Sequence, residues 1–180
     1  NIGTPIPGVE IKIVGSDGCE IMDGSPGELH VRGPNVMLGY FRQPELTEAV
    51  IDKDGYLNTG DIVSVNSKQE MVVQGRTKEL IIRSGFNVYP PEIEAALNTH
   101  PAVLNSAVVG RSIEGNEEIV AFVEPVPGCH IEIDTLFALL DEQLARYKKP
   151  QKIIVMSQLP VAPNGKIRKN DLKKYAEALP

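Results

Sequence analysis

Three short segments of this 180-residue chain combine residue types that can bind phosphates, diols or thiols. The first segment, residues 56–61 (YLNTGD), places a glycine beside Asp61. Glycine allows a close approach of the backbone, and the carboxylate can accept two hydrogen bonds from a vicinal diol. Taken alone, a Thr-Gly-Asp sequence predicts no more than a turn.

The second segment joins a charged cluster to a glycine loop. Residues 75–79 (GRTKE) supply the charges, residues 83–87 (RSGFN) supply the loop, and an acidic stretch, residues 91–94 (PEIE), follows. The simplest interpretation of this segment is an exposed linker followed by a β-turn.

The third segment, residues 163–166 (PNGK), places Lys166 at the tip of a Pro/Gly loop. A lysine in such a position can bring a point charge to a phosphate. For the tetrapeptide alone, a solvated loop lysine is the simpler interpretation.

Charge is unevenly distributed along a chain whose formal net charge is −6. Residues 1–75 carry 5 Lys/Arg and 11 Asp/Glu, whereas residues 146–174 carry 9 basic residues and one acid, Asp171. A solvated face explains the basic stretch as well as a site for a nucleotide, a phosphorylated cofactor or nucleic acid does. Nucleic acid is disfavoured by the overall acidity and by the scarcity of aromatic residues in that stretch.

Composition excludes some classes of protein. Hydrophobic residues make up 42% and charged residues 23% of the chain, and no apolar run is long enough to span a bilayer, so we expect no transmembrane segment. Two distant cysteines, Cys19 and Cys129, predict a reducing, cytoplasmic compartment, and no residues have metal-ligand spacing. Because the chain begins at Asn1 without a signal stretch, we expect that upstream sequence has been removed.

Hydrophobic patterns predict the elements that must position these segments. Alternation predicts an antiparallel β module over residues 1–75, with a short helix at 45–51. Its strands are expected at residues 9–13, 29–31, 61–65 and 70–73. Strands alternate with helices over residues 76–180, which predicts a compact α+β domain. Its strands are expected at 79–82, 104–109, 119–123 and 152–156, and its helices begin at Pro90, at an N-capping Asp134 and near Asn170.

Two apolar stripes are expected to form core contacts of the second domain. One comprises Leu136, Leu139, Leu140 and Leu144, and the other comprises Leu172, Tyr175 and Leu179. The fold class predicted from these patterns is α+β, a small antiparallel β module followed by an α+β carboxy-terminal domain.

In this order and spacing, the segments resemble the carboxy-terminal part of the adenylate-forming superfamily, which includes acyl- and aryl-CoA ligases, firefly luciferase and peptide-synthetase adenylation domains. The resemblance covers essentially the whole chain. Residues 27–33 (GELHVRG) with residues 39–40 resemble the family's β-barrel segment, and residues 56–61 its ribose-binding turn. Residues 75–94 resemble its hinge and thioesterification segment, and residues 159–166 its catalytic-lysine loop.

The resemblance implies a two-step reaction. A carboxylate attacks the α-phosphate of ATP to give an acyl-adenylate and pyrophosphate, and a thiol then attacks the acyl carbon and releases AMP. The resemblance assigns the ribose of ATP to Asp61 and Arg76. It makes Lys166 the catalytic residue that neutralises charge during the first step.

The resemblance also implies that residues 1–75 end a large amino-terminal domain and that residues 76–180 form a mobile domain. Lys78 is the implied hinge. Rotation would withdraw Lys166 and present the loop of Ser84, Gly85 and Phe86 to coenzyme A.

Residues 147–150 (YKKP) resemble the Tyr-Lys-x-Pro of CoA ligases, whereas peptide-synthetase domains usually carry Tyr-Met-x-Pro there. The resemblance therefore implies coenzyme A as the acceptor and Lys149 as a contact to its phosphates. Fatty acids are the expected acids because they are common in the family, while aryl and short-chain acids stay open. Residues 161–162 (VA) and Asn164 depart from the family's usual residues.

The family's phosphate loop, acyl pocket, adenine-stacking aromatic and Mg²⁺-binding glutamate are expected upstream of Asn1. ATP, Mg²⁺ and coenzyme A are therefore expected of a longer ligase, of which these 180 residues form an inactive fragment. Three alternatives stay open: a non-catalytic nucleotide- or CoA-binding or interaction module, an adenylation domain of a peptide synthetase, and an RNA-associated α+β domain.

Overall fold

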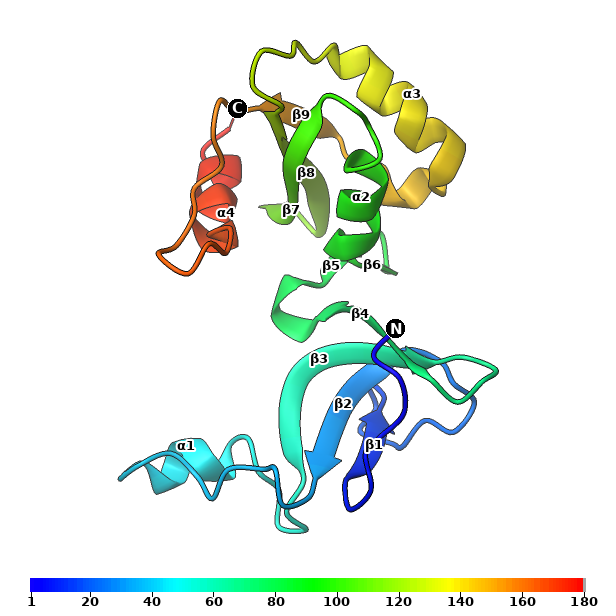
Figure 1. Ribbon diagram of the computed structural model, residues 1–180, viewed down its shortest axis with the longest axis vertical. Coiled ribbons are helices and arrows are strands. Elements are labelled where there is room, and N and C mark those ends of the chain that lie inside the picture. The colour runs from blue at the N-terminus through cyan, green and yellow to red at the C-terminus, as the bar shows by residue number, and fades with distance from the viewer. Residues whose placement is uncertain (180) are drawn as a thin grey trace. The chain divides into compact units, whose positions relative to one another are not determined.

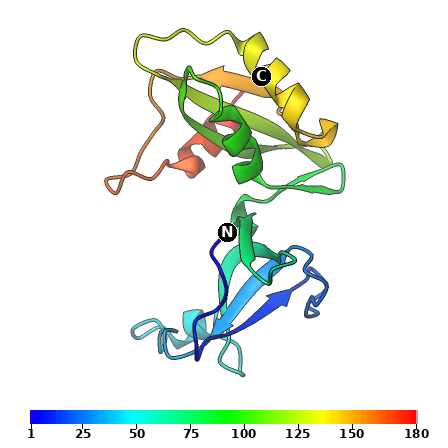
Figure 2. The same ribbon diagram turned by 45° about the vertical axis from the view of Figure 1, so that its right-hand side comes forward.

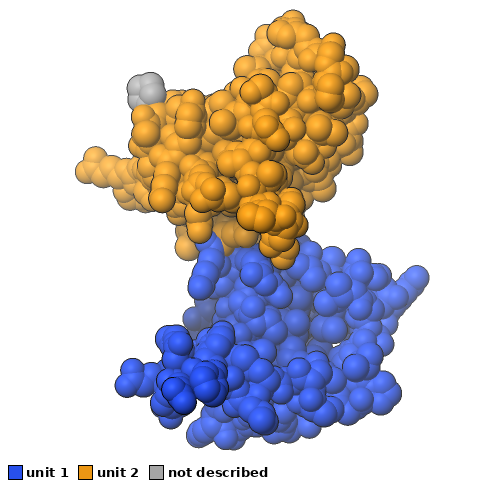
Figure 3. Space-filling view, turned by 60° about the vertical axis from the view of Figure 1, so that its left-hand side comes forward, with its two compact units in different colours: residues 1–78 blue, residues 79–180 orange. Residues whose placement is uncertain are grey.

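The structure, a computed structural model, describes residues 1–179 and divides into two compact units, residues 1–78 (unit 1) and residues 79–180 (unit 2), coloured separately in Figure 3. The predicted domain boundary at residue 75 falls just before this division. Arg76 and Thr77 stay with unit 1 because Arg76 Nε donates to Asp61 Oδ1 at 2.8 Å and Thr77 Oγ1 donates to Glu28 Oε1 at 2.6 Å.

Unit 1 is built on one antiparallel sheet with the strand order β1-β2-β3-β4 (Figure 1). Its elements are β1 (Glu10–Val14), β2 (Gly27–Arg32), α1 (Pro44–Glu48), β3 (Leu57–Val65) and β4 (Met71–Arg76). Ile13, Leu29, Val63 and Met71 form its buried cluster. These residues come from all four strands, so the alternation seen in the sequence does mark the face of the sheet that becomes a core.

Unit 2 combines a small hairpin, a three-stranded sheet and three α-helices. The hairpin strands are β5 (Ile81–Arg83) and β6 (Phe86–Val88); the sheet strands are β7 (Val103–Ile113), β8 (Asn116–Pro125) and β9 (Lys152–Val155). The helices are α2 (Pro90–Leu97), α3 (Ile133–Gln143) and α4 (Lys169–Glu177), with the 3₁₀ turn η2 (Arg146–Lys148); another 3₁₀ turn, η1 (Thr77–Glu79), begins in unit 1 and contributes only Glu79 to unit 2. The pair β7 and β8 is antiparallel, whereas β8 and β9 are parallel and are joined through α3.

The central strand β8 divides its buried side chains between the two faces of this sheet. Ile119 and Ala121 belong to a cluster that includes residues of β5, α2 and α3. Val120 and Phe122 belong to a second cluster that includes Leu172 of α4. The sheet therefore lies between α2 and α3 on one face and α4 on the other, as Figures 1 and 2 show.

The strand β7 lies at the edge of the sheet, and side chains satisfy part of its outer backbone. The Val108 N–H donates to Glu94 Oε1 at 2.8 Å, and the Ser112 N–H donates to Glu177 Oε1 at 3.0 Å. Carboxylates from α2 and α4 thus take the place that a further strand would occupy.

The predicted α+β class is confirmed: an antiparallel β module precedes an α+β domain. Some local predictions were wrong. The expected strand at 79–82 starts later, at Ile81, because residues 77–79 form η1. Asp134 does not cap α3: the helix begins at Ile133 after Glu132, and no side chain caps it.

Most of the two predicted apolar stripes is confirmed as core. Leu136 and Leu140 are fully buried in α3, four residues apart on one face, and Leu144 is buried in the same cluster, whereas Leu139 is only partly buried. In the second stripe, Leu172 is buried and Leu179 packs against its cluster, while Tyr175 is 48% exposed although its ring meets Phe122 edge-on. Among the described residues, no helix has the length and apolarity needed to cross a membrane.

Leu140→Ala should lower the free energy of unfolding by about 3 kcal/mol, because removal of a fully buried leucine leaves a cavity in the core. Leu139→Ala is the matched control and should cost less than about 1 kcal/mol, because that side chain is partly solvated. Urea denaturation followed by circular dichroism measures both changes. Equal losses would contradict the face assigned to α3.

Candidate functional site

The turn that the sequence predicts within residues 56–61 is wrong, because residues 57–61 form the bulged start of β3. The pairing register of β2 and β3 shifts between Glu28 and His30. Thr59 Oγ1 donates to the Leu29 carbonyl at 2.9 Å and accepts the Asp61 N–H at 3.1 Å. Gly60 adopts a φ of 70°, in the left-handed region that favours glycine. The bulge sets where the Asp61 side chain leaves the sheet.

Asp61 and Arg76, the two residues expected to bind ribose, are direct partners. They face each other in the register of β3 and β4, and Arg76 Nε lies 2.8 Å from Asp61 Oδ1. Their side chains are 32% and 62% exposed, respectively. The contact uses one carboxylate oxygen and one guanidinium nitrogen, so the pair can still offer an acceptor and donors to a diol.

Tyr56 anchors the start of this segment. Two cations contact its ring: Lys12 Nζ lies 3.8 Å from the ring centre and the Arg32 guanidinium carbon 4.5 Å from it. Its hydroxyl donates to Glu10 Oε2 at 3.2 Å. Sequence reasoning identified Tyr56 but not these three partners, because they lie on β1 and β2 and only the fold brings them together.

The predicted thiol-facing loop is the tip of the β5–β6 hairpin. Ser84 and Gly85 have φ angles of 50° and 80°, which is typical of a type I′ turn. The Ser84 N–H donates to Asn116 Oδ1 at 2.7 Å, and Asn116 Nδ2 donates to Ser84 Oγ at 3.2 Å. A Cβ atom placed on Gly85 would meet no atom within 4 Å, so this tip lies open.

The hairpin is also fixed to residues 147–150. Phe86 stacks on Tyr147 with ring centroids 4.8 Å apart, and Phe86 is 55% exposed. Arg83 Nη1 donates to the carbonyls of Tyr147 and Lys149 at 3.0 and 2.7 Å. The structure therefore brings together the two segments that the sequence assigned to coenzyme A.

Much of the basic stretch at residues 146–174 is compensated by acids. Within 3 Å lie the ion pairs Lys148–Glu92, Lys149–Asp141, Lys169–Glu79 and Lys169–Glu94, whose acids come from outside the stretch, and Arg168–Asp171, whose acid is the one within it. The count along the chain therefore overstated the positive charge available to a phosphate. Lys149, the expected CoA contact, is already paired with Asp141 at 2.5 Å. Its ammonium would therefore have to be shared between Asp141 and a phosphate of the ligand.

Lys169 contacts two carboxylates at once. Its Nζ lies 2.6 Å from Glu79 Oε2 and 2.8 Å from Glu94 Oε1. Burial opposes the charged form, but the two carboxylates outweigh burial and raise the pKa of Lys169 above its ordinary value. The ammonium therefore stays charged inside the domain at neutral pH.

Lys166 is exposed directly after the tip of a short hairpin-like loop, one position later than the tip expected from the sequence. The backbone of Ala162 donates to the Lys166 carbonyl at 2.8 Å, and Gly165 has a φ of 79°. Asn164 Oδ1 accepts the Lys166 N–H at 3.2 Å, so the asparagine supplies an acceptor for the loop. Among the described residues, no carboxylate forms an ion pair with the Lys166 ammonium.

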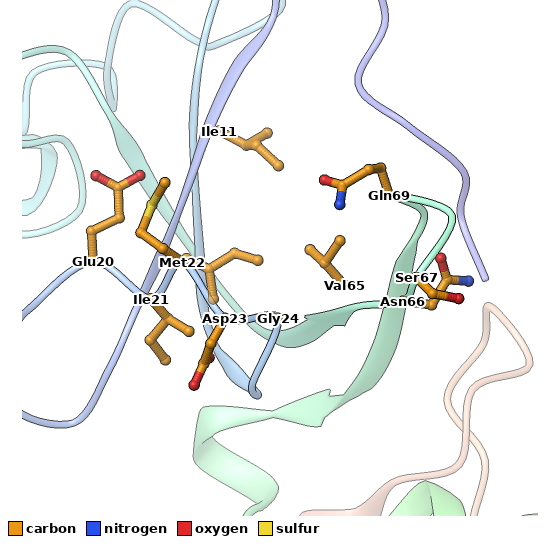
Figure 4. A pocket seen from close by; sticks show the side chains of 11 residues that line it. Ile11, Glu20, Ile21, Met22, Asp23, Gly24, Val65, Asn66, Ser67 and Gln69 are labelled. Carbon is orange, nitrogen blue, oxygen red and sulfur yellow. The ribbon is translucent and has the colours of Figure 1, made fainter.

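An open depression lies beside Lys166 in unit 2, and its lining combines the acids Glu79 and Asp171 with four cations, Lys166, Arg168, Lys169 and Lys174. Another depression lies on unit 1, between β1, the loop at residues 20–24 and the turn after β3 (Figure 4). Its lining includes the acids Glu20 and Asp23 and contains no lysine, arginine or histidine. The first depression suits an anion and the second does not.

Lys78, the expected hinge, is exposed within η1, the last residue of unit 1. For metals, residues 1–179 contain no group of three or more His, Cys, Asp or Glu side chains arranged to hold an ion. The described residues therefore do not fit a Mg²⁺ site, and none of the roles proposed below involves a metal.

Two family descriptions match this chain. The description of the AMP-binding enzyme C-terminal domain matches residues 92–166, and that of the AMP-binding enzyme matches residues 1–41.

Curated relatives match along nearly the whole chain. 4-Coumarate–CoA ligase 5 of Oryza sativa subsp. japonica is 42% identical over 181 residues, which cover 99% of this chain and 34% of the relative. Long-chain-fatty-acid–CoA ligase of Escherichia coli O157:H7 is 38% identical over 176 residues, which cover 98% of this chain and 31% of the relative. The chain spans about a third of the length of the curated relatives it matches.

A solved structure of ATP-bound MatB from Rhodopseudomonas palustris is 36% identical and matches with a TM-score of 0.89, over 98% of this chain and 35% of MatB. Apo MatB matches over the same 98% with a TM-score of 0.71. The part of MatB that corresponds to this chain therefore differs in conformation between the two crystal structures.

Lys169→Met should lower the free energy of unfolding by about 2 kcal/mol at neutral pH, because two carboxylates lose their shared partner. Since the pKa of Lys169 is raised, its contribution is complete below the ordinary lysine pKa of 10.5 and is lost as the pH rises through the higher folded-state value. Thermal unfolding at stepped pH should show a constant gap between wild type and variant up to pH 10.5 and a narrowing gap above it. A gap that closes well below that pH would contradict the raised pKa.

Proposed function

The chain belongs to the AMP-binding, adenylate-forming enzyme family, and from that premise we propose that it forms the carboxy-terminal part of an AMP-forming acid–thiol ligase. The enzyme would activate a carboxylic acid with ATP and transfer the acyl group to coenzyme A. For the acid we propose a fatty acid, which the E. coli relative supports; the name of the rice relative makes an aryl acid the second candidate.

In the first half-reaction, Asp61 and Arg76 would hold the ribose hydroxyls of ATP. Their 2.8 Å contact supports this role, because the ion pair fixes the carboxylate before the nucleotide arrives. Lys166 would neutralise the charge that develops between the carboxylate and the α-phosphate. An exposed ammonium without a protein carboxylate partner is suited to that role.

In the second half-reaction, the tip of the β5–β6 hairpin would line the path of the pantetheine arm. Gly85 leaves room for a thin chain, since no atom lies within 4 Å of its missing side chain. Phe86 and Lys149 would contact the nucleotide end of coenzyme A. Ser84, which is bonded to Asn116, would hold the turn that precedes Phe86.

The single observation that carries this proposal is the placement of the two sets of residues on opposite faces of one sheet. Ile81 and Val88 of the hairpin belong to the cluster with α2 and α3, whereas Leu159 and Ile167, which flank the Lys166 loop, pack in the cluster with α4. A rigid domain cannot turn both faces toward one substrate at once. Rotation of unit 2 about Lys78 would present them in sequence, and the two MatB conformations support such a change.

Lys166→Ala in the full-length enzyme should lower the rate of acyl-adenylate formation by about a thousandfold, because a positioned charge on the transition state is lost. Thioester formation from pre-made acyl-adenylate should change by less than about twofold. Single-turnover assays of each half-reaction measure both rates. The matched control is Lys173→Ala, which removes an exposed lysine elsewhere in unit 2. An equal fall in both half-reactions would overturn the assignment of Lys166.

The 180-residue chain by itself should release no pyrophosphate from ATP above the buffer background. The reason is that the described residues contain Asp61, Arg76 and Lys166, whereas we propose that the acyl pocket lies in another part of the enzyme. A pyrophosphate-release assay with long-chain fatty acids and 4-coumarate tests this expectation. Turnover that depends on the acid would contradict it, and the same panel run on the full-length enzyme ranks the two acid classes.

A further inference from the structure

A compact ion cluster joins three elements of unit 2. Lys169, the first residue of α4, contacts Glu79 at the end of η1 and Glu94 in the middle of α2. The three side chains are 22%, 34% and 17% exposed. The Val108 N–H of β7 also donates to Glu94, at 2.8 Å. The cluster therefore reaches around the edge of the sheet, from the helix on one face to the helix on the other.

The position of Lys169 in its helix is unfavourable by itself. A cation in the first turn of a helix faces the positive end of the helix dipole, which is unfavourable. The exposed Lys173 and Lys174 occupy later turns, where a cation is better placed. Glu79 and Glu94 offset the unfavourable interaction of Lys169 with the helix dipole. The ion pairs of this lysine, rather than helix formation, therefore explain why a lysine stands at residue 169.

Lys169 also stands three residues after Lys166 in the chain, and Glu79 directly follows Lys78. The loop that carries Lys166 ends where α4 begins, so a shift at the start of α4 would displace the loop. The contact with Glu79 thus ties the loop to the first residue of unit 2.

We propose that Lys169 is a positioning residue for Lys166. Its ion pairs with Glu79 and Glu94 fix the Lys166 loop to the segment that follows the hinge, so that rotation of unit 2 brings the Lys166 ammonium to one defined position. This inference rests on the proposed function. The β5–β6 hairpin is held by other contacts: Ser84 bonds to Asn116, and Arg83 and Phe86 both contact Tyr147. Loss of the cluster should therefore affect adenylation and spare thioester formation.

The test uses the full-length enzyme with Lys169→Met, Lys169→Arg and the control Lys173→Met. Lys169→Met should lower kcat for acyl-adenylate formation by about tenfold to a hundredfold with little change in KM for ATP, because misplacement by about an ångström has that effect. Thioester formation from pre-made acyl-adenylate should change by less than about twofold. Lys169→Arg should restore most of the lost rate, and Lys173→Met should match the wild type.

Glu79→Gln provides a second variant of the same contact that keeps its shape, and it should lower adenylation in the same direction with a smaller effect. Equal losses in both half-reactions, or no loss in either, would overturn the positioning role. Failure of the proposed function is distinguishable: it would appear as normal adenylation by Lys166→Ala itself. If Lys166→Ala fails selectively while Lys169→Met and Glu79→Gln do not, only this inference is wrong.

Discussion

The alternation of side chains along β8 is the constraint on which unit 2 depends. A strand must point successive residues to opposite faces, so Ile119 and Ala121 pack toward α2 and α3 while Val120 and Phe122 pack toward α4. A one-residue slip in the register of β8 would exchange the two sets of side chains between the faces, so neither face would keep the residues that pack on its helices. The same geometry separates the β5–β6 hairpin, whose Ile81 and Val88 pack with α2 and α3, from the Lys166 loop, which is flanked by residues that pack with α4.

Periodicity in the sequence was sufficient to predict the fold class. Alternation at residues 9–13, the apolar run at 119–123 and the proline pair that opens α2 correspond to real elements, because each pattern follows directly from strand or helix geometry. Predictions that depended on one side chain were less successful. Asp134 has the right type for a cap, yet the helix begins one residue earlier, and the packing of Leu136 and Leu140 decides where it lies.

The sequence could name residues for the candidate site, whose roles stay predictions, but it could not give their contacts. Short motifs identified Asp61, Arg76 and Lys166, but the ion pair between the first two follows from the register of β3 and β4, which no local pattern encodes. Charge counting failed for the same reason. The acids that neutralise Lys148 and Lys169 come from α2 and η1, more than fifty residues earlier in the chain.

The carboxylates that cover the edge of β7 have a consequence for the behaviour of the chain in solution. An uncovered edge strand offers N–H and C=O groups to a strand of another molecule, which is a common start of aggregation. Glu94 and Glu177 occupy the N–H groups of Val108 and Ser112. A second sheet could pair with this part of the edge only by displacing both carboxylates from these hydrogen bonds, which opposes edge-to-edge joining there.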